Sequence, residues 1–223
     1  MNKELKKSIP ILVIFVLFSI GMVATIMHFL TPVKVLPVFN PADVNPDLVD
    51  ESLQDVKKYH TIADFRLFDQ NGDTITQDTY KDKIYIADFF FTTCQTICPK
   101  MSSNMMVLQE KYKNDSDIRL LSHSVTPVLD SVPVLRNYAD QMGAIDSIWH
   151  LCTADKKHIY ALARKSYFAV LDKGDGGAQD FIHTENFILV DKKRRIRGFY
   201  DGTDSKDIDL LMQDIETLRK EYR

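Results

Sequence analysis

Two cysteines, Cys94 and Cys98, stand three residues apart in the stretch FFFTTCQTICPKM (residues 89–101) and are followed at once by Pro99. Proline lacks a backbone N–H and is tolerated in the first turn of a helix, so we expect a helix to begin near Cys98, with Cys94 in the loop before it. Both sulfurs then lie near the positive end of the helix dipole, which favours thiolate over thiol and lowers the cysteine pKa. Thiolate is the form that binds metals and attacks disulfides.

A cysteine pair at this spacing supports three kinds of chemistry: a structural disulfide, thiol exchange or metal binding. A structural disulfide between Cys94 and Cys98 would close a very short loop, where the entropic gain is smallest, in a chain with ample apolar content. We therefore rank it below the other two. Paired cysteines at a helix N-terminus are what a thiol oxidoreductase requires, and thiolates are also good ligands for soft metals.

A histidine far along the chain is a candidate third ligand. The stretch LDKGDGGAQDFIHTENFILVD carries Gly174, Gly176 and Gly177 in a loop that runs into His183, just before an apolar strand. A lone histidine is more often a surface or satisfied residue than a ligand. Joined to two thiolates, however, His183 makes an S₂N set, which suits Cu(I) and, with an added donor, Cu(II). Structural zinc would need a fourth protein ligand, for which the sequence has no obvious candidate.

Strands and helices alternate from His60 onward. The Asn71-Gly72 pair predicts a hairpin turn, and the apolar run KIYIADFFFT (residues 83–92) predicts a buried central strand. Further strands are predicted at residues 118–125, 148–153, 186–191 and 195–202, and helices at 98–113, 130–143, 155–168 and 205–223. This order predicts an α/β fold in which a mixed central sheet has helices on both faces. The dithiol follows the C-terminal end of the central strand, where α/β folds place their sites.

Composition narrows the class of protein. The chain has 223 residues, of which 45% are apolar, and a formal net charge of -3. These values are typical of a globular protein with one domain and extra segments. They give no general affinity for nucleic acid, because that affinity requires a basic surface.

The first thirty residues predict where the protein is located. From Ile11 to Leu30 the chain has no Asp, Glu, Lys or Arg, and a helix of that length reaches about 30 Å, the thickness of a bilayer core. Lys3, Lys6 and Lys7 precede this run, so the positive-inside bias keeps the N-terminus cytoplasmic. We therefore predict an uncleaved, single-pass anchor in the inner membrane of a bacterium, with everything after it on the periplasmic side.

The predicted domain organisation has three parts. Residues 1–31 are the cytoplasmic tip and the transmembrane anchor in the lipid bilayer. Residues 32–58 contain four prolines, which favour an extended, semi-rigid linker. Residues 59–223 form the globular α/β domain that carries the cysteine pair.

Three blocks of the sequence carry a family resemblance. They are FFFTTCQTICPKM (89–101), SHSVTPVLDSVPVLRNYADQMGAIDSIWHLCTADKKHIYALARKSYF (122–168) and DFIHTENFILVDKKRRIRGFYDGTD (180–204). In order and spacing they resemble the Sco family, also called SenC, whose members are thioredoxin-like, membrane-anchored copper proteins. The resemblance runs from about His60 to Asp204, and its specific part is the C-x-x-x-C-P motif with a distant histidine before a strand. It implies a thioredoxin-like fold for residues 59–223.

The resemblance also implies a function, which is copper binding and delivery of copper to the CuA centre of cytochrome c oxidase subunit II. An upstream copper donor or thiol reductant would be a further partner. Carried over onto this chain, the ligands would be Cys94, Cys98 and His183, holding one copper as Cu(I) or Cu(II). Family members commonly have C-P-D-x-C-P, whereas this chain has Gln95 and Thr96 in place of the proline and the aspartate. The ligands stay intact, but the electrostatics beside them change.

Two other activities stay open for the cysteine pair. The first is a thiol-disulfide reductase that keeps the cysteines of a partner reduced, with Cys94 and Cys98 as the redox-active pair and His183 only modulating their reactivity. The second, weaker alternative is peroxide reduction by a single cysteine. Copper binding that depends on His183 separates the chaperone from both.

Several other residues invite a functional interpretation. Cys152 lies in an apolar strand and is expected to be a core residue, as are Met101 and Met105 on a helical apolar stripe. His123 lies at the end of a strand that could approach the dithiol, and it is a candidate to support the cysteines without binding a metal itself. The basic hairpin tip at residues 192–195 is expected to be a solvated turn or a docking point for an acidic partner or lipid headgroups.

Overall fold

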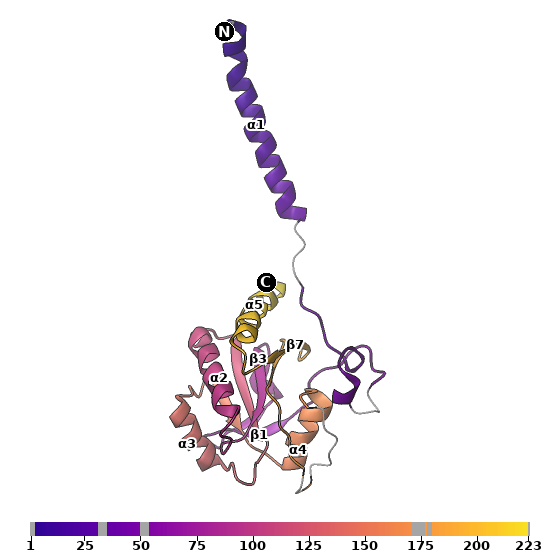
Figure 1. The fold of residues 1–223 in the computed structure, drawn as a ribbon, viewed down its shortest axis with the longest axis vertical. Coiled ribbons are helices and arrows are strands. Elements are labelled where there is room, and N and C mark those ends of the chain that lie inside the picture. Colours follow the sequence, from indigo (N-terminus) through magenta and orange to yellow (C-terminus); the bar gives the residue numbers. More distant parts are fainter. Residues whose placement is uncertain (1–2, 31–34, 50–53, 171–176, 178–179, 223) are drawn as a thin grey trace. The chain divides into compact units, whose positions relative to one another are not determined.

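Figure 1 shows the computed structural model of the chain, in which residues 3–30, 35–49, 54–170, 177 and 180–222 are described. The helices are α1 (Lys3–Leu30), α2 (Cys98–Tyr112), α3 (Val132–Met142), α4 (Lys156–Ala161) and α5 (Ser205–Glu221). The strands are β1 (Arg66–Phe68), β2 (Thr74–Thr76), β3 (Ile84–Phe90), β4 (Ile118–Ser124), β5 (Trp149–Cys152), β6 (Asn186–Val190) and β7 (Ile196–Asp201). Their order confirms the predicted alternation of strands and helices.

The chain forms two compact units, Met1–Val35 and Leu36–Arg223. α1 belongs to the first unit, and many of its apolar side chains between Leu12 and Met27 are exposed. The sequence predicts a membrane span at this position. A helix is found there, but among the residues that the structure describes no helix is both long and apolar enough to cross a membrane.

Five strands form the central sheet of the second unit, in the order β5-β4-β3-β6-β7. β3, β4 and β5 are parallel, whereas β6 is antiparallel to β3 and β7 is antiparallel to β6. β3 lies in the middle of the sheet, and all seven of its residues are buried. The mixed sheet and its central strand confirm the prediction from the sequence. β1 and β2 form a separate hairpin around Gly72, whose φ of 82° suits glycine in the predicted turn.

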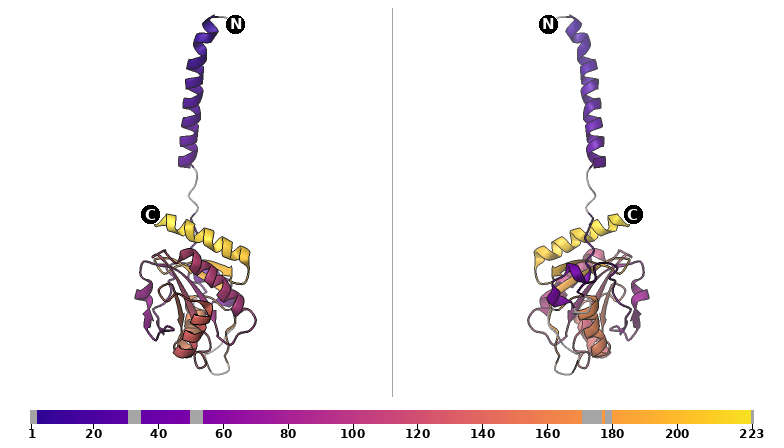
Figure 2. Two further views of the ribbon diagram at one scale, coloured as in Figure 1. Left: turned by 90° about the vertical axis from the view of Figure 1, so that its left-hand side faces the viewer. Right: turned by 90° about the vertical axis from the view of Figure 1, so that its right-hand side faces the viewer.

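Helices cover both faces of this sheet (Figure 1). α2, α3 and α5 bury apolar side chains in one core, against Ile84 and Ile86 of β3. α2 and α5 lie next to each other on this face, and α5 is seen lengthwise in Figure 2. α4 and the β1–β2 hairpin pack on the other face, against Tyr85 and Ala87. Because successive side chains of a strand point to opposite faces, β3 contributes to both cores.

Part of the predicted linker is packed on the folded unit. Leu36 and Val49 are buried, one in each core. Arg197 of β7 donates to the carbonyl oxygens of Leu36 and Pro37 over 2.7 and 2.9 Å, and Glu221 of α5 accepts the Leu36 N–H over 2.7 Å. The folded unit therefore begins at Leu36, more than twenty residues before the predicted start at residue 59.

The predicted helix at residues 155–168 changes character midway. Asp155 caps its N-terminus as expected, since the Asp155 carboxylate accepts the N–H of His158. The α-helix ends at Ala161, however, and a π-helical turn follows from Leu162 to Ser166. A π turn adds one residue to an otherwise helical run, and the periodicity of apolar residues does not reveal such a local insertion.

Candidate functional site

The two cysteines lie where β3 leads into α2. β3 ends at Phe90, and the loop Phe91–Ile97 carries Cys94 to the start of α2 at Cys98. Pro99 stands in the first turn of the helix, as predicted, where its missing N–H has no intrahelical partner to lose. Both side chains are nearly buried, with exposed fractions of 8% for Cys94 and 2% for Cys98, and both are free thiols.

The sulfur of Cys94 accepts a hydrogen bond from the N-terminus of α2. The backbone N–H of Cys98 donates to the Cys94 Sγ, with 3.4 Å between nitrogen and sulfur. The Thr96 Oγ1 lies 3.6 Å from the same sulfur. The Cys94 N–H in turn donates to the carbonyl oxygen of Phe91 over 3.2 Å, which folds the loop back on itself. The structure thus confirms the predicted placement of a cysteine sulfur at a helix N-terminus.

These contacts make the two thiols chemically different. Burial raises the pKa of the Cys94 thiol, but hydrogen bonds from the Cys98 thiol, the Cys98 N–H and Thr96 outweigh it and lower the pKa to about 7. Burial also raises the pKa of the Cys98 thiol, and donation to Cys94 adds to this effect, so its pKa rises to about 12. At neutral pH, Cys94 is therefore substantially thiolate while Cys98 keeps its proton.

A buried carboxyl group shares the α2 face of the sheet with the dithiol. Burial raises the pKa of Asp88 in β3 to about 7, opposed by a hydrogen bond from Ser122. Ser122 is the register partner of Asp88 in β4, and its hydroxyl accepts the Nε1–H of Trp149 over 2.8 Å. Within the described residues, the Asp88 Oδ1 has no hydrogen-bond partner. The charge of Asp88 contributes to the high pKa of Cys98. No role for Asp88 is predicted from the sequence, although an aspartate inside an apolar strand indicates a buried carboxyl group.

A second buried carboxylate holds the loop that precedes Cys94. Asp130 is fully buried and accepts hydrogen bonds from the Thr92 N–H and hydroxyl, over 3.2 and 2.5 Å. It also accepts from the hydroxyls of Ser124 and Thr126, over 2.5 and 2.9 Å. The N-cap residue of α3 is Ser131, so Asp130 lies just before the helix. This carboxylate joins the ends of β3 and β4, and so positions the cysteine loop.

His183 is the third predicted ligand, and the structure does not place it with the two cysteines. Its side chain is exposed, in the segment before β6. Across the described ranges, no three side chains of His, Cys, Asp or Glu lie close enough to hold a metal ion. The segment does approach the cysteine loop, because the Phe181 ring meets the Phe91 ring edge-on with 5.2 Å between centroids. Gly174 and Gly176 of the predicted glycine-rich loop lie outside the described residues.

His123 lies on the other face of the sheet from the cysteines, so the prediction that it approaches the dithiol is wrong. Its ring stacks on Phe89, with 4.7 Å between centroids, and lies near Phe65 and Tyr167. Burial lowers the pKa of His123 to about 4. Strand alternation explains the error. The sequence predicts that His123 lies at the end of a strand, but it does not show which face of the sheet the side chain occupies. Three other residues are fully buried as predicted: Cys152, Met101 and Met105.

Comparison with known proteins assigns the chain to a family. It matches the family SCO1/SenC over residues 54–220. It is also similar to BsSco, described as a member of the Sco family of cytochrome c oxidase assembly proteins with a disulfide switch. The identity is 30%, the TM-score is 0.61, and 71% of this chain and 93% of that chain are covered. This similarity supports the thioredoxin-like fold that the family resemblance implies for the α/β unit described above.

Two further structures share the fold. A SCO1/SenC family lipoprotein from Bacillus anthracis str. Ames is 28% identical, with a TM-score of 0.63, and the match covers 72% of this chain and 95% of that chain. Arabidopsis thaliana ScoI with copper bound is 22% identical, with a TM-score of 0.55 and coverage of 71% and 98%, and at this identity the similarity concerns the fold alone. With the family match over residues 54–220, the chain belongs to the SCO1/SenC family.

Proposed function

We propose that this protein binds copper through its dithiol and delivers it to the CuA centre of cytochrome c oxidase subunit II. The observation that carries the proposal is the hydrogen bonding of the Cys94 sulfur, which accepts the Cys98 N–H over 3.4 Å. Hydrogen bonds from the Cys98 thiol, the Cys98 N–H and Thr96 together lower the pKa of Cys94 to about 7. Soft thiolate ligands select Cu(I). Arabidopsis ScoI holds copper in the same fold, and BsSco is described as belonging to a family of cytochrome c oxidase assembly proteins.

His183 is the third ligand in this proposal. Its support is the contact between Phe181 and Phe91, which joins the segment before β6 to the cysteine loop. Phe181 is two residues before His183, and Phe91 is three residues before Cys94. Copper binding then requires the segment to turn so that the imidazole faces the sulfurs. The neutral imidazole adds one nitrogen to the two sulfurs and completes an S₂N set.

The redox state of the cysteine pair controls copper binding in this proposal. Oxidation of the two thiols to a Cys94–Cys98 disulfide removes two electrons and two protons and leaves no thiolate for the metal. A thiol reductant must then return both electrons before copper is bound again. The partners are therefore an upstream copper donor, a thiol reductant and the oxidase subunit that receives the metal.

The difference between the two thiol pKa values supports a second candidate function, a thiol-disulfide reductase. The Cys94 thiolate would attack a partner disulfide and release one partner thiolate, forming a mixed disulfide. Cys98 would then lose its proton and attack the Cys94 sulfur, which releases the second partner thiolate. The partner gains two electrons, and this chain ends with a Cys94–Cys98 disulfide.

An anaerobic Cu(I) titration against a competing chelator distinguishes these functions. The chaperone requires one copper per chain, no tight binding after Cys94→Ser or Cys98→Ser, and binding weakened at least tenfold by His183→Ala. His158→Ala, which removes a histidine from α4, is the matched control and should bind copper as the unmodified chain does. Binding that is indifferent to His183 contradicts the three-ligand site. Disulfide exchange without copper binding favours the reductase.

We also propose that the domain works at the extracytoplasmic face of a membrane, to which the N-terminal segment attaches it. The exposed apolar side chains of α1 support attachment, and one relative is described as a lipoprotein. Fractionation of cells that express the full chain tests this. Recovery in the membrane fraction, with the Leu36–Arg223 unit open to protease added outside the cytoplasm, is the expected result, and recovery in the cytoplasmic fraction contradicts it.

A further inference from the structure

A basic pocket of about 420 Å³ lies between the segment before β1 and the turn that joins β6 to β7. The first wall carries Lys58, Tyr59 and His60, and the second carries Lys193 and Arg195. None of these residues belongs to the dithiol site, and the proposed copper chemistry leaves them without a role. The predicted basic tip thus lines a concave surface, which a solvated turn does not explain.

Two positive charges in this pocket are free to meet a ligand. Within the described part of the chain, the ammonium groups of Lys58 and Lys193 make no ion pair or hydrogen bond, and both side chains are exposed. Arg195 is held by Asp191, with 2.8 Å from Nε and 2.7 Å from Nη2 to the carboxylate, and its Nη1 has no such contact. No carboxylate of the described residues lines the pocket. Its chemistry therefore suits an anion.

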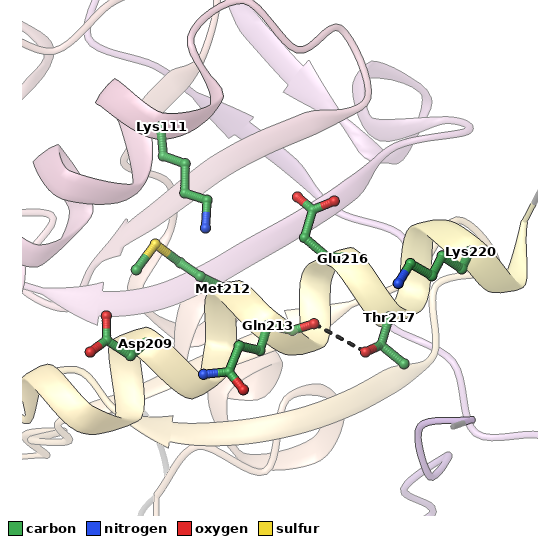
Figure 3. Close-up of a pocket in the computed structure, with 7 residues that line it drawn as sticks. All are labelled: Lys111, Asp209, Met212, Gln213, Glu216, Thr217 and Lys220. Atoms are coloured by element: carbon green, nitrogen blue, oxygen red, sulfur yellow. Dashed lines mark hydrogen bonds between the residues drawn. The ribbon is translucent and has the colours of Figure 1, made fainter. Parts of the chain in front are cut away.

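The groove between α2 and α5 shows the contrast (Figure 3). It has a similar size, about 440 Å³, and also carries two lysines, Lys111 and Lys220. Two carboxylates, Asp209 and Glu216, line the same groove. Their charges balance those of the lysines, so this groove has no preference for anions. Lys111 and Lys220 are therefore matched controls for the lysines of the basic pocket.

The backbone around the basic pocket is held in an unusual conformation. Tyr59 has a φ of 68° and Arg194 a φ of 64°, in the left-handed region that non-glycine residues seldom adopt. The Ile62 N–H donates to the Arg194 carbonyl oxygen over 2.8 Å, which ties the two walls together. This conformation leaves the Tyr59 side chain 94% exposed at the rim. Strain of this kind persists where surrounding structure maintains it, and it often marks a binding site.

We propose that this pocket binds the phosphate group of an anionic phospholipid headgroup. Two free ammonium groups and a guanidinium suit a phosphate, and a tyrosine with an apolar ring and a polar hydroxyl suits the headgroup region of a bilayer. The position of the pocket in the chain favours a lipid phosphate over a soluble phosphate. Its first wall starts at Val38, eight residues after the end of α1, so at most about 30 Å of chain separates it from an apolar helix.

Vesicle binding by residues 36–223, the unit that contains both hydrophobic cores, tests the proposal without α1 and without copper. The probes are phosphatidylcholine vesicles with and without phosphatidylglycerol, in co-sedimentation at low and high salt. Binding is expected only with phosphatidylglycerol and should weaken as salt rises. Lys58→Gln with Lys193→Gln should reduce it roughly 25-fold, at roughly fivefold per lysine. Lys111→Gln with Lys220→Gln should change it by less than about twofold, because Asp209 and Glu216 line the same groove as these lysines.

Three results overturn the proposal. Equal weakening by both lysine pairs would show general attraction of a charged domain to a charged surface. No binding to phosphatidylglycerol vesicles by the unmodified unit would exclude the headgroup. Saturable binding of inorganic phosphate, lost with Lys58→Gln and Lys193→Gln, in the absence of vesicle binding would replace the lipid by a soluble phosphate. Circular dichroism of each variant checks that the fold is retained, and copper affinity is measured separately.

Discussion

The backbone N–H of Cys98 points at the sulfur of Cys94 across 3.4 Å, so the first residue of α2 stabilises a thiolate in the loop before it. The Cys98 thiol donates to the same sulfur, and this lowers the pKa of one cysteine while it raises that of the other. One pair of residues thus combines a thiolate that can act as nucleophile or ligand with a thiol that stays protonated at neutral pH.

Alkylation by iodoacetamide should follow this difference. Cys94 is expected to react with a midpoint near pH 7, whereas Cys98, with a pKa of about 12, should stay unmodified through neutral pH. Cys98→Ala removes the thiol donor and should move the Cys94 midpoint upward. Cys98→Ser keeps a donor at that position and should move it less. Rates measured by mass spectrometry against pH check the order, and identical midpoints in both variants would contradict the hydrogen bond.

Asp88→Asn should remove a loss of stability at high pH. The folded-state pKa of about 7 lies above the ordinary value, so this carboxyl contributes stability below about pH 4 that is lost as pH rises through 7. The loss amounts to roughly 4 kcal/mol between about pH 4 and pH 8. Asparagine does not titrate, so urea unfolding of the variant should show a flatter pH profile. Asp140→Asn, at an exposed position on α3, is the control, and an equal change there would argue against burial as the cause.

His123→Phe should remove a loss of stability that occurs as the pH falls. Burial lowers the pKa of His123 to about 4, so the folded state excludes a proton that the unfolded chain binds. Stability is therefore lost as pH falls from about 6.5 to about 4, by roughly 3 kcal/mol. Phenylalanine keeps the stacking on Phe89 and cannot titrate. Because Asp88 acts in an overlapping pH range, urea unfolding is compared in the Asp88→Asn background. An unchanged acid slope would contradict the assignment.

Asp130→Ala should loosen the cysteine loop. The substitution removes four hydrogen bonds to Thr92, Ser124 and Thr126 and should cost about 3 kcal/mol of unfolding free energy. It should also raise the rate of Cys94 alkylation, because the loop that shields this thiol loses its anchor. Thermal unfolding and alkylation are measured together. The exposed Asp140→Ala, which loses an ion pair to Arg136, should cost less than about 1 kcal/mol.

Arg197→Leu should release the start of the folded unit. It leaves the buried Asp191 and the half-buried Glu221 without this partner and removes the donors to the carbonyl oxygens of Leu36 and Pro37. The expected cost is about 3–5 kcal/mol, and the Leu36 amide should exchange with solvent faster. Hydrogen exchange and denaturant unfolding check both.

Arg194→Ala breaks an exposed ion pair with Asp64 and is the control for this substitution, with an expected cost below about 1 kcal/mol. If Arg197→Leu also cost less than that, the segment from Leu36 to Pro37 would be held by packing alone.

The local features of this protein follow from the sequence by itself. Pro99 predicts the start of α2 beside the cysteines, Gly72 the β1–β2 turn and Gly143 the end of α3, where the structure has a φ of 68°. Each depends on the φ values that a proline or a glycine allows. Those values follow from the residue itself and not from distant parts of the chain. The alternation of apolar strands and helices likewise predicts the α/β class, and the cysteine spacing predicts a sulfur at a helix N-terminus.

Long-range relationships were decided only by the tertiary structure. The register of β3 with β4 sets Asp88 beside Ser122 on the face of the dithiol, and the same register puts His123 on the opposite face. The Leu36 carbonyl oxygen accepts a hydrogen bond from Arg197, which lies 161 residues later in the chain. Side-chain alternation has a period of two, so the sequence shows which residues share a face but not what covers that face. Only the packing of distant elements determines which buried groups meet and which pKa values shift.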